Sequence, residues 1–447
     1  MAERSRTPNT GLPSLLDQAN WSRSQFASII NRVGAEAGLS LTYGQPAVSQ
    51  WIAGHQPRSQ VRALIIEAFA RKLGRPVTFS EAGLTPPPSA TTQDTVGELV
   101  DLGKADMDPS RRGILAAGIF SAALIVPLFP DLAVAAEPAP VLLGKATTRI
   151  GTGQVAIVRT MTDRIADILD ELGAGHARPM AAAFLVNSVG PWLKAQASDE
   201  VRRDMLAAAS DLTYLTGWMA MYERAHSLGQ QYYVSALKLA GEAEDHITYC
   251  RTLRGMSLQA SNLGYGRRAL ELADSAAEAA PVAGPRLTAF LRGQQAHGAA
   301  MVGDQRQAFN RLREAGDALA RADDGKDSVG GYDRTALLFH EAHVLNETGD
   351  LFGSIRALKE SIRIQPSGQR QGRLHSYAVL AQRQHSYGHV EAACDSWNRF
   401  LDEYEHLSSS RGDEHFDTMR RRLKPHAKIQ AVRTLTERAA LVGAMKG

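Results

Sequence analysis

Four glycines at regular spacing in the second half of the chain constrain its fold more than any other feature. Gly264, Gly303, Gly349 and Gly388 each follow an apolar helical segment and precede another. Their spacings are 39, 46 and 39 residues, and the longest contains the polar, glycine-rich stretch 323–331. Because glycine readily ends a helix in a left-handed conformation, this period predicts a series of helical hairpins that turn at the glycines.

Small residues recur on both sides of these glycines, five positions after and seven positions before each one. They are Ala269, Ala308, Ser354 and Ala393 after the glycines, and Ser257, Ala296, Ala342 and Ala381 before them. Small side chains at both places allow paired helices to approach closely, as in a tetratricopeptide hairpin. An earlier, degenerate unit is expected to turn near Arg224. The period is longer than the 34 residues of the standard repeat, so we predict a tetratricopeptide-like α-solenoid over 141–447.

In tetratricopeptide hairpins the first helix lines the concave face, and this resemblance nominates residues for a groove. They are Arg251, Arg254, Asn262, His297, His343, Asn346, Gln382 and His385. Guanidinium groups pair well with carboxylates, so such a groove suits a peptide, a small-molecule anion or a protein partner. The alternative is that these side chains only cover a solvated surface.

The stretch 45–54 predicts a short helix near the N-terminus, with a proline in its first turn and a glycine at its end. Val48 and Trp51 recur at helical spacing, which gives this helix one apolar face. Ser49 and Gln50 lie on the other side. A short helix with an uncharged polar outer face has a width that fits the major groove of B-form DNA.

Helices are also expected over 12–20, 22–37 and 60–73. The segments 22–37 and 45–53 together resemble the helix-turn-helix of repressor-type, XRE-like regulators, although 31–43 contains more residues than the compact motif needs. This insertion, together with 73–78 and 81–84, resembles a family of actinomycete regulators. Its members join such a head to a tetratricopeptide-like body, and they include negative regulators of Streptomyces differentiation and antibiotic production.

The resemblance implies double-stranded DNA as a partner, with the helix over 45–53 in the major groove. The residues expected to contact DNA are Arg23, Gln45, Ser49, Gln50, His55 and Arg58. A side-chain amide can pair bidentately with adenine, so Gln45 and Gln50 are the expected base readers. Arg23, His55 and Arg58 would bind backbone phosphates and set the register. The alternative for Gln50 is plain solvent exposure.

The domain organisation follows from composition. We expect a helix-turn-helix domain over 1–84, a linker over 85–110 and a hydrophobic helical segment over 111–140, followed by the repeats. The uncharged run 113–130 follows two arginines. It has three interpretations: a helix buried against the next domain, a membrane anchor, or a twin-arginine export signal. We favour the buried helix and hence a cytoplasmic protein.

Charge and cysteine content are weak guides to partners. The net charge is +3, and the first 88 residues contain nine Lys or Arg and five Asp or Glu. This modest surplus is compatible with phosphate contacts. Cys250 and Cys394 are the only two cysteines, which fits a reducing compartment without a disulfide framework.

No sequence motif supports catalysis, a metal or a cofactor. The glycines in 151–156 fit a dinucleotide fingerprint, but no strand precedes them. His340 and His343 are three residues apart, whereas the zinc-protease helix needs four. The basic run 420–424 is best interpreted as a solvated helix face. We therefore do not expect an enzyme.

Taken together, these patterns predict an all-α protein in which a helix-turn-helix domain is joined to a tetratricopeptide-like α-solenoid. The predicted function is a sequence-specific transcription regulator, a repressor, whose repeats sense a ligand or partner or form a homodimer. The alternative is a tetratricopeptide scaffold whose head does not bind DNA and which is anchored to a membrane through 113–130.

Overall fold

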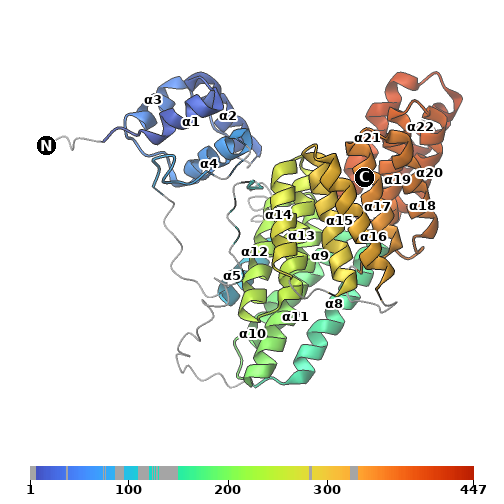
Figure 1. Ribbon diagram of the computed structural model, residues 1–447, viewed down its shortest axis with the longest axis horizontal. Helices are drawn as coiled ribbons and strands as arrows, with labels where there is room; N and C mark the ends of the chain where they lie inside the picture. The colour runs from blue at the N-terminus through green and yellow to red at the C-terminus, as the bar shows by residue number, and fades with distance from the viewer. Residues whose placement is uncertain are drawn as a thin grey trace.

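The computed structural model describes residues 7–36, 39–73, 75, 77–85, 95–108, 120–122, 124, 126, 129, 149–280, 284–322 and 331–446. Figure 1 shows two parts, a small head of four helices and a larger body of paired helices. Among the described residues the only extended pairing is an isolated bridge between Arg149 and Gln196. The predicted all-α class is confirmed.

The helices of the head begin and end within one or two residues of the predicted positions. They are α1 (Gly11–Ala19), α2 (Arg23–Glu36), α3 (Gln45–Ile52) and α4 (Ser59–Leu73). In their core Phe26 and Phe69 stack with ring centroids 4.6 Å apart, and Val48 and Trp51 of α3 are buried in the same cluster. The apolar face predicted for α3 therefore packs inward.

The extra residues between α2 and α3 are fixed at their end by Asn31 of α2. Its side-chain Nδ2 donates to the carbonyl oxygen of Tyr43 at 2.8 Å, and its Oδ1 accepts from the Tyr43 N–H at 2.8 Å. The Tyr43 ring then lies edge-on to Trp51, 5.1 Å between centroids. The start of α3 is thus positioned by α2 despite the longer connection.

The body is a succession of helix pairs. Its helices are α5 (Thr95–Met107), α8 (Thr152–Leu172), α9 (Ala174–Phe184), a π-helical turn (Leu185–Val189), α10 (Gly190–Leu193), α11 (Asp199–Tyr222), α12 (His226–Glu242), α13 (His246–Asn262), α14 (Gly266–Glu278), α15 (Pro285–Met301), α16 (Gln305–Ala320), α17 (Arg334–Glu347), α18 (Leu351–Ile364), α19 (Arg370–Ser386), α20 (Val390–Tyr404), α21 (Ser410–Leu423), a 3-10 turn (Lys424–His426) and α22 (Gln430–Lys446). From α11 to α20, consecutive helices pack as antiparallel pairs, which is consistent with a helical repeat (Figure 1).

The predicted turn glycines confirm this period. Gly264, Gly303, Gly349 and Gly388 each separate the two helices of a pair and have φ values of 80°, 84°, 92° and 92°. Arg224, near the predicted degenerate turn, has a φ of 59° and separates α11 from α12. A left-handed residue ends each first helix, and glycine takes this conformation without steric cost.

The predicted small residues lie where the paired helices touch, and all eight are fully buried. Two of them also bond across their pair: the Ser257 hydroxyl donates to the carbonyl oxygen of Ala269 at 2.6 Å, and the Ser354 hydroxyl donates to that of Ala342 at 2.8 Å. A larger side chain at these positions would separate the helices and break these bonds.

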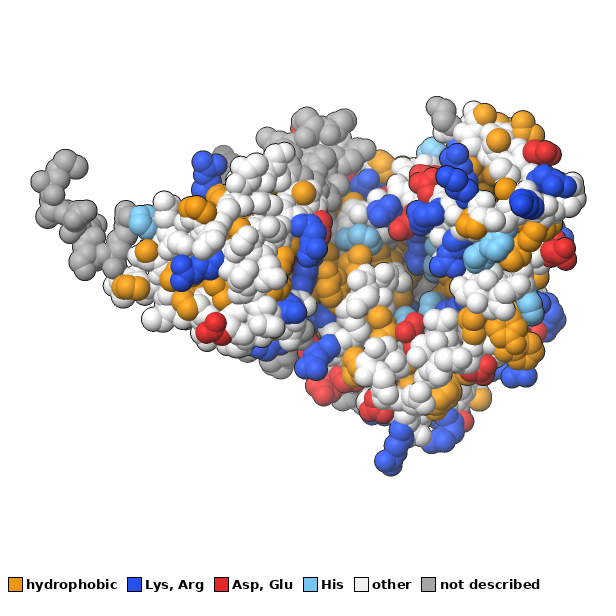
Figure 2. Space-filling view, turned by 90° about the horizontal axis from the view of Figure 1, so that it is seen from above, with side chains coloured by type: hydrophobic (Ala, Val, Ile, Leu, Met, Phe, Trp, Pro, Cys, Tyr) orange, Lys and Arg blue, Asp and Glu red, His pale blue; other side chains and the backbone are white. Residues whose placement is uncertain are grey.

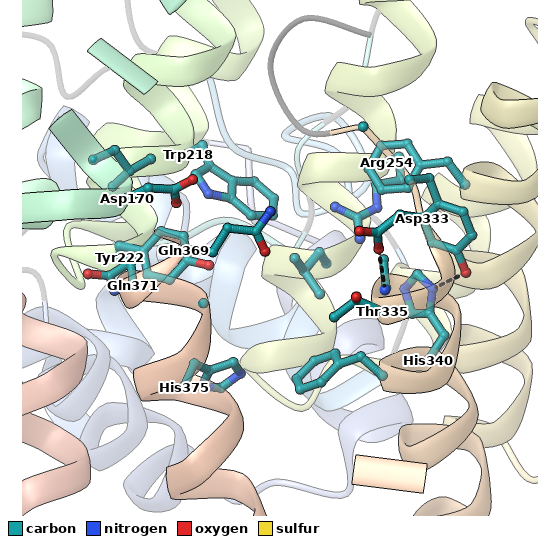
Figure 3. Close-up of a pocket in the computed structure, with 18 of the residues that line it drawn as sticks. Asp170, Trp218, Tyr222, Arg254, Asp333, Thr335, His340, Gln369, Gln371 and His375 are labelled. Carbon is teal, nitrogen blue, oxygen red and sulfur yellow. Dashed lines mark hydrogen bonds between the residues drawn. The ribbon is translucent and has the colours of Figure 1, made fainter. Parts of the chain in front are cut away.

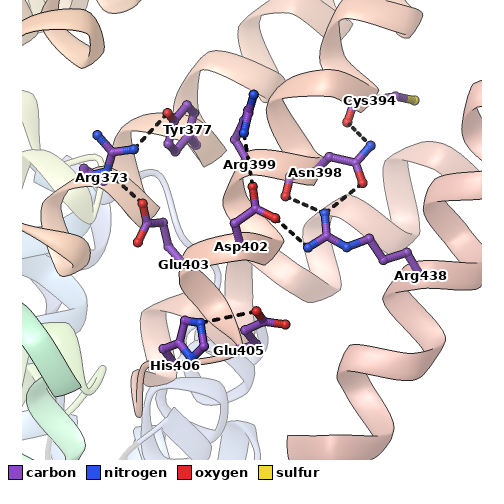
Figure 4. Close-up of polar contacts among 10 residues, drawn as sticks. All are labelled: Arg373, Tyr377, Cys394, Asn398, Arg399, Asp402, Glu403, Glu405, His406 and Arg438. Atoms are coloured by element: carbon purple, nitrogen blue, oxygen red, sulfur yellow. Dashed lines mark hydrogen bonds and ion pairs between the residues drawn. The ribbon is translucent and has the colours of Figure 1, made fainter. Parts of the chain in front are cut away.

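Polar contacts reinforce the last pairs (Figure 4). Arg438 of α22 donates to Asp402 of α20 at 2.6 Å and to the backbone oxygen of Asn398 at 2.9 Å. Arg373 of α19 pairs with Glu403 of α20 at 2.7 Å. These contacts join three helices on the outside of the body.

The segment before α21 contacts two early helices of the body, α8 and α9. The Ser408 N–H donates to the oxygen of Leu172 at 2.8 Å, and the Gly175 N–H donates to the oxygen of Ser408 at 3.0 Å. The Ser410 hydroxyl adds a bond to the Glu223 carboxylate at 3.0 Å. Because α8 also contacts α19, the inner side of the repeats faces α8.

Gly173 is required at this contact. Its φ of 93° and ψ of 167° lie in a region that is essentially restricted to glycine, and a Cβ there would lie 2.3 Å from the Ser408 oxygen. Gly173→Ala should lower the free energy of unfolding by at least about 1–3 kcal/mol, measured by urea denaturation. The control is Gly151→Ala, where φ is −138° and an added Cβ would meet no atom within 4 Å. Equal stability of the two variants would contradict this role.

The stretch 85–110, predicted as a linker, contains a helix of the body. Helix α5 covers most of it, and Leu99 is fully buried in the core. Asp106 of α5 is buried, forms an ion pair with Arg178 of α9, and accepts from the Tyr232 hydroxyl of α12 at 3.0 Å. The prediction of a linker was wrong for 95–107. The mixed composition of this stretch does not show which distant helices α5 packs against.

Most of the uncharged run 113–130 lies outside the described residues, and so does most of 111–140. Among the described residues of this run, 120–122, 124 and 126 are not helical, whereas Phe129 is. Phe120 is nevertheless buried against the body, and Gln230 of α12 both donates to and accepts from the Ser121 backbone at 2.8 Å. In the part of the chain that the structure describes, no helix is both long and apolar enough to cross a membrane.

Candidate functional site

The first candidate surface is the polar side of α3. Gln45 and Gln50 are exposed and Ser49 is half-exposed, while the opposite side of the helix is buried. Gly44 precedes the helix in an extended conformation, and no side chain caps its first turn. The N–H groups at the start of α3 thus have no side-chain acceptor. Figure 1 shows α3 on the side of the head away from the body, whereas α4 lies nearest to it.

The basic residues predicted to bind phosphate surround this helix. The Arg23 guanidinium reaches across from α2 and donates to the Ser49 hydroxyl at 3.3 Å. His55, just beyond α3, has its Nδ1 3.2 Å from the Gln50 carbonyl oxygen. Arg58 is exposed at the start of α4. The Ser49 hydroxyl in turn donates to the backbone oxygen of Gln45 at 3.1 Å, so direct contacts involve five of the six predicted residues. Ser49 is partly buried, and the other five residues are exposed.

Charge alone does not mark this surface. Figure 2 shows Lys and Arg side chains interspersed with Asp and Glu over the face of the molecule seen from above. The argument for the head therefore depends on which groups α3 presents, and charge adds only a general attraction for phosphate.

The second candidate is a cavity of about 320 Å³ on the inner side of the repeats. Its walls come from α8, α11, α13, α15, α17, α19 and the start of α21. Side chains from these helices converge on it, with Arg254, Asp333 and His340 at one end and Tyr222, Gln371 and Asp170 at the other (Figure 3). Its volume lies at the lower end of the range for small-molecule sites.

Half of the predicted groove residues line this cavity. Arg254, Asn262, His297 and His343 do so. The other four do not line it, and the structure places them as follows: Arg251 pairs with Asp211 at 3.0 Å, Asn346 bonds to Glu347 at 3.2 Å, Gln382 contacts His415 at 3.3 Å, and the His385 ring packs on His426.

Several lining residues were missed, but the repeat register contains a signal for them. His343 lies six residues before its glycine, and Phe339 lies ten residues before it. His375 lies thirteen before Gly388, as Phe290 does before Gly303. Positions thirteen, ten and six residues before the glycine lie on one face of a helix, so this spacing indicates further lining residues on the first helix of each pair.

Arg254 and Arg411 line the cavity, and only Arg411 is near enough to an acidic side chain, Glu414, to feel its charge. No ion pair joins either of them to an acidic side chain of the described chain. The Arg254 guanidinium lies 4.0 Å from the centroid of Phe290, and its Nε is buried with no hydrogen-bond partner. Burial lowers the pKa of Arg254 from its ordinary value. A buried cation without a counter-ion is costly unless a ligand supplies the negative charge.

Two histidines of the cavity accept hydrogen bonds from arginines, and these bonds define their tautomers. Arg411 donates to Nε2 of His375 at 2.8 Å, so this nitrogen carries no proton. Nδ1 of His375 is then the donor to His415, 3.0 Å away. Arg383 likewise contacts Nδ1 of His343 at 3.3 Å, which leaves Nε2 of His343 as an N–H donor.

These histidines are neutral near pH 7. Burial, and secondarily the charge of Arg411, hold the pKa of His375 well below its ordinary value. Burial, followed by His297 and Arg383, does the same to the pKa of His343. Within the described residues no group of three or more His, Cys, Asp or Glu side chains is placed to hold a metal ion.

Two acidic side chains border the cavity. The carboxylate of Asp333 caps α17 and accepts from the Ala336 N–H at 2.9 Å. Burial, together with the charges of Asp167 and Glu171, raises the pKa of Asp170 to about 6. At one end of the cavity, the Asp333 carboxylate is therefore occupied as a helix cap. At the other end, the Asp170 carboxylate loses its negative charge as the pH falls through about 6.

Comparison with known proteins concerns the head. Residues 12–85 match the family model of the SP15 N-terminal domain. This range contains α1 to α4 and all six residues predicted to contact DNA. The cavity lies wholly outside the SP15-like head, and no curated protein matches the chain.

Proposed function

We propose that this chain is a cytosolic, sequence-specific DNA-binding regulator, a repressor, in which α2 and α3 act as a helix-turn-helix. The observation that supports this most strongly is the free polar side of α3. Gln45 and Gln50 are exposed there, and Arg23 reaches its edge through Ser49. In this proposal the two amides read base edges in the major groove, and Arg23, His55 and Arg58 contact phosphates.

The body acts as the controlling part in the same proposal. Its paired helices form a tetratricopeptide-like solenoid, and its cavity takes up a ligand or partner that alters DNA binding, or its surface forms a homodimer on paired half-sites. The segment around residue 122 is a route for such coupling. The Ala122 N–H donates to Glu67 of α4 at 3.2 Å, and Ala122 is buried against the body. No reaction is assigned to the chain.

Substitutions in the head test the docking. Gln50→Ala should change sequence preference and cost roughly 1–3 kcal/mol at one base pair, whereas Arg58→Ala should weaken binding to all sequences alike. Competition binding on a randomised duplex library measures both effects. The control is Lys72→Ala, which removes one exposed charge at the far end of α4. If Gln50→Ala leaves every sequence equally well bound, α3 is not the reading helix.

A scaffold with a head that binds protein is the second candidate, favoured by the long α2–α3 connection and the mixed surface charge. Salt dependence separates the two, because DNA binding releases counterions and falls steeply with salt.

A further inference from the structure

We propose that the cavity of the body is a binding site for a small organic anion with a flat apolar part. The anionic group would lie near Arg254 at one end of the cavity, and the flat part would lie among the aromatic side chains between Arg254 and Arg411. This inference rests on the sensor part of the proposed function and adds the chemical class of the ligand.

The first argument is the contrast between buried arginines in this protein. Arg178 is paired with Asp106 and Arg251 with Asp211, so each has an internal counter-ion. Arg254 is only 6% exposed and has no such partner among the described residues. Arg411, also a cavity residue, instead donates to a neutral histidine. A carboxylate or similar group would supply the missing charge and accept in the fork geometry of a guanidinium.

The second argument is the presence of N–H donors that face the cavity. His343 receives a bond on Nδ1, so the N–H on its Nε2 is left for other partners, and His343 lines the cavity. Asn262 adds an amide to the same wall. The two acids of the lining are Asp333, which caps a helix, and Asp170, at the other end. The lining also offers neutral acceptors, because Gln365 and Gln371 each have a buried side-chain oxygen without a hydrogen bond, and these would suit a donor group on the ligand.

The third argument concerns the apolar part. Trp218, Tyr222, Phe290, Tyr332 and Phe339 all line the cavity. Such rings provide large flat surfaces for a planar ligand. At about 320 Å³ the space suits a small molecule, and a folded partner or a helix would not fit.

The site should bind anions more tightly as the pH falls. The groups that face it are Arg254, Arg411, Asp170, Asp333 and the neutral histidines His297, His340, His343 and His375. The pKa of Asp170 is about 6, so its repulsion of an anion disappears below that pH. A bound anion also favours protonation of the histidines, and both effects have the same sign.

The test uses the intact chain and two probes without any DNA. 8-Anilino-1-naphthalenesulfonate carries a flat ring system and a negative charge, and N-phenyl-1-naphthylamine is its neutral counterpart. We expect the anion to bind with one-to-one stoichiometry, at least about tenfold more tightly than the neutral probe at pH 7, with a larger ratio at pH 6. Equal affinity for the two probes would overturn the inference, and this comparison needs no variant.

Variants then locate the anion. Arg254→Gln should reduce affinity for the anionic probe by about tenfold or more and leave the neutral probe within twofold, while Arg254→Lys should retain most of the preference. The matched control is Arg292→Gln, a half-buried arginine of α15 that pairs with Glu314 and does not line the cavity. Equal loss of anion binding in Arg254→Gln and Arg292→Gln would overturn the inference. Because the assay contains no DNA, failure of DNA binding and failure of this site give separate results.

Discussion

At pH 5 the free energy of unfolding is expected to be lower than at pH 8 by at least roughly 5 kcal/mol. Burial lowers the pKa of His226 and His297 to about 4 and that of His415 to about 3, from an ordinary value of 6.5. Each of these histidines binds a proton at a higher pH in the unfolded chain than in the folded protein. The free energy of unfolding therefore falls as the pH drops below 6.5. Three such groups amount to about 2 kcal/mol each at pH 5.

One carboxyl group partly opposes this loss. The pKa of Asp170 is raised to about 6, so the folded protein takes up a proton there as the pH falls, which returns about 1 kcal/mol. Burial also holds the pKa values of His340, His343 and His375 well below their ordinary value, and these three groups add to the loss. The net loss is a large part of the 5–15 kcal/mol by which native domains are stable.

Urea denaturation at pH 8, 6 and 5 measures this prediction. His297→Gln should reduce the difference between pH 8 and pH 5 by about 2 kcal/mol, because the variant has no proton to gain at that site. His389→Gln, at an exposed position before α20, is the control and should leave the difference unchanged. A free energy of unfolding that stays constant down to pH 5 would show that the histidines are not held neutral by burial.

Asp106→Ala should destabilise the body by about 3–5 kcal/mol. Asp106 is 1% exposed and accepts bonds from Arg178 and from the Tyr232 hydroxyl. Removing its carboxylate leaves the guanidinium of Arg178 buried without a counter-ion and the hydroxyl without its acceptor. Helix α5 would then lose its attachment to α9 and α12.

Helix α5 also provides the control for this prediction. Asp101 is exposed and lies 3.9 Å from Lys104, so Asp101→Ala should change stability by less than about 0.5 kcal/mol. Thermal melting of the two variants gives the comparison, and limited proteolysis after residue 94 reports on the detachment of α5. Similar stability of both variants would mean that α5 does not depend on Asp106.

The repeat could be predicted because its requirements are local. A left-handed turn selects glycine at positions such as Gly349, and close helix contact selects a small side chain at positions such as Ala342 and Ser354. Each requirement falls at a fixed distance along the chain, so the sequence alone shows the period. The buried side of α3 was predictable for the same reason, since Val48 and Trp51 are a single helical turn apart.

The cavity and α5 depend on contacts between distant residues, and no local pattern indicates these. The wall that contains Asp170 faces the repeats because α8 packs on α11 and α19 and because Ser408 bonds to Leu172 and Gly175. The partners that give Asp106 its role, Arg178 and Tyr232, lie on α9 and α12, far from α5 in the sequence. The sequence shows that Arg254 is an arginine, but whether a carboxylate lies beside it depends on how the distant helices pack.

Binding of the intact chain to genomic duplex fragments over a range of salt concentrations tests the central claim most directly. With Arg23 and Arg58 on phosphates, the logarithm of the affinity should fall linearly with the logarithm of the salt concentration, with a slope of roughly −2 per head. Selected fragments should share a sequence that Gln50→Ala no longer prefers. No binding to any fragment at low salt would contradict the account, since an exposed α3 would then have no DNA to read.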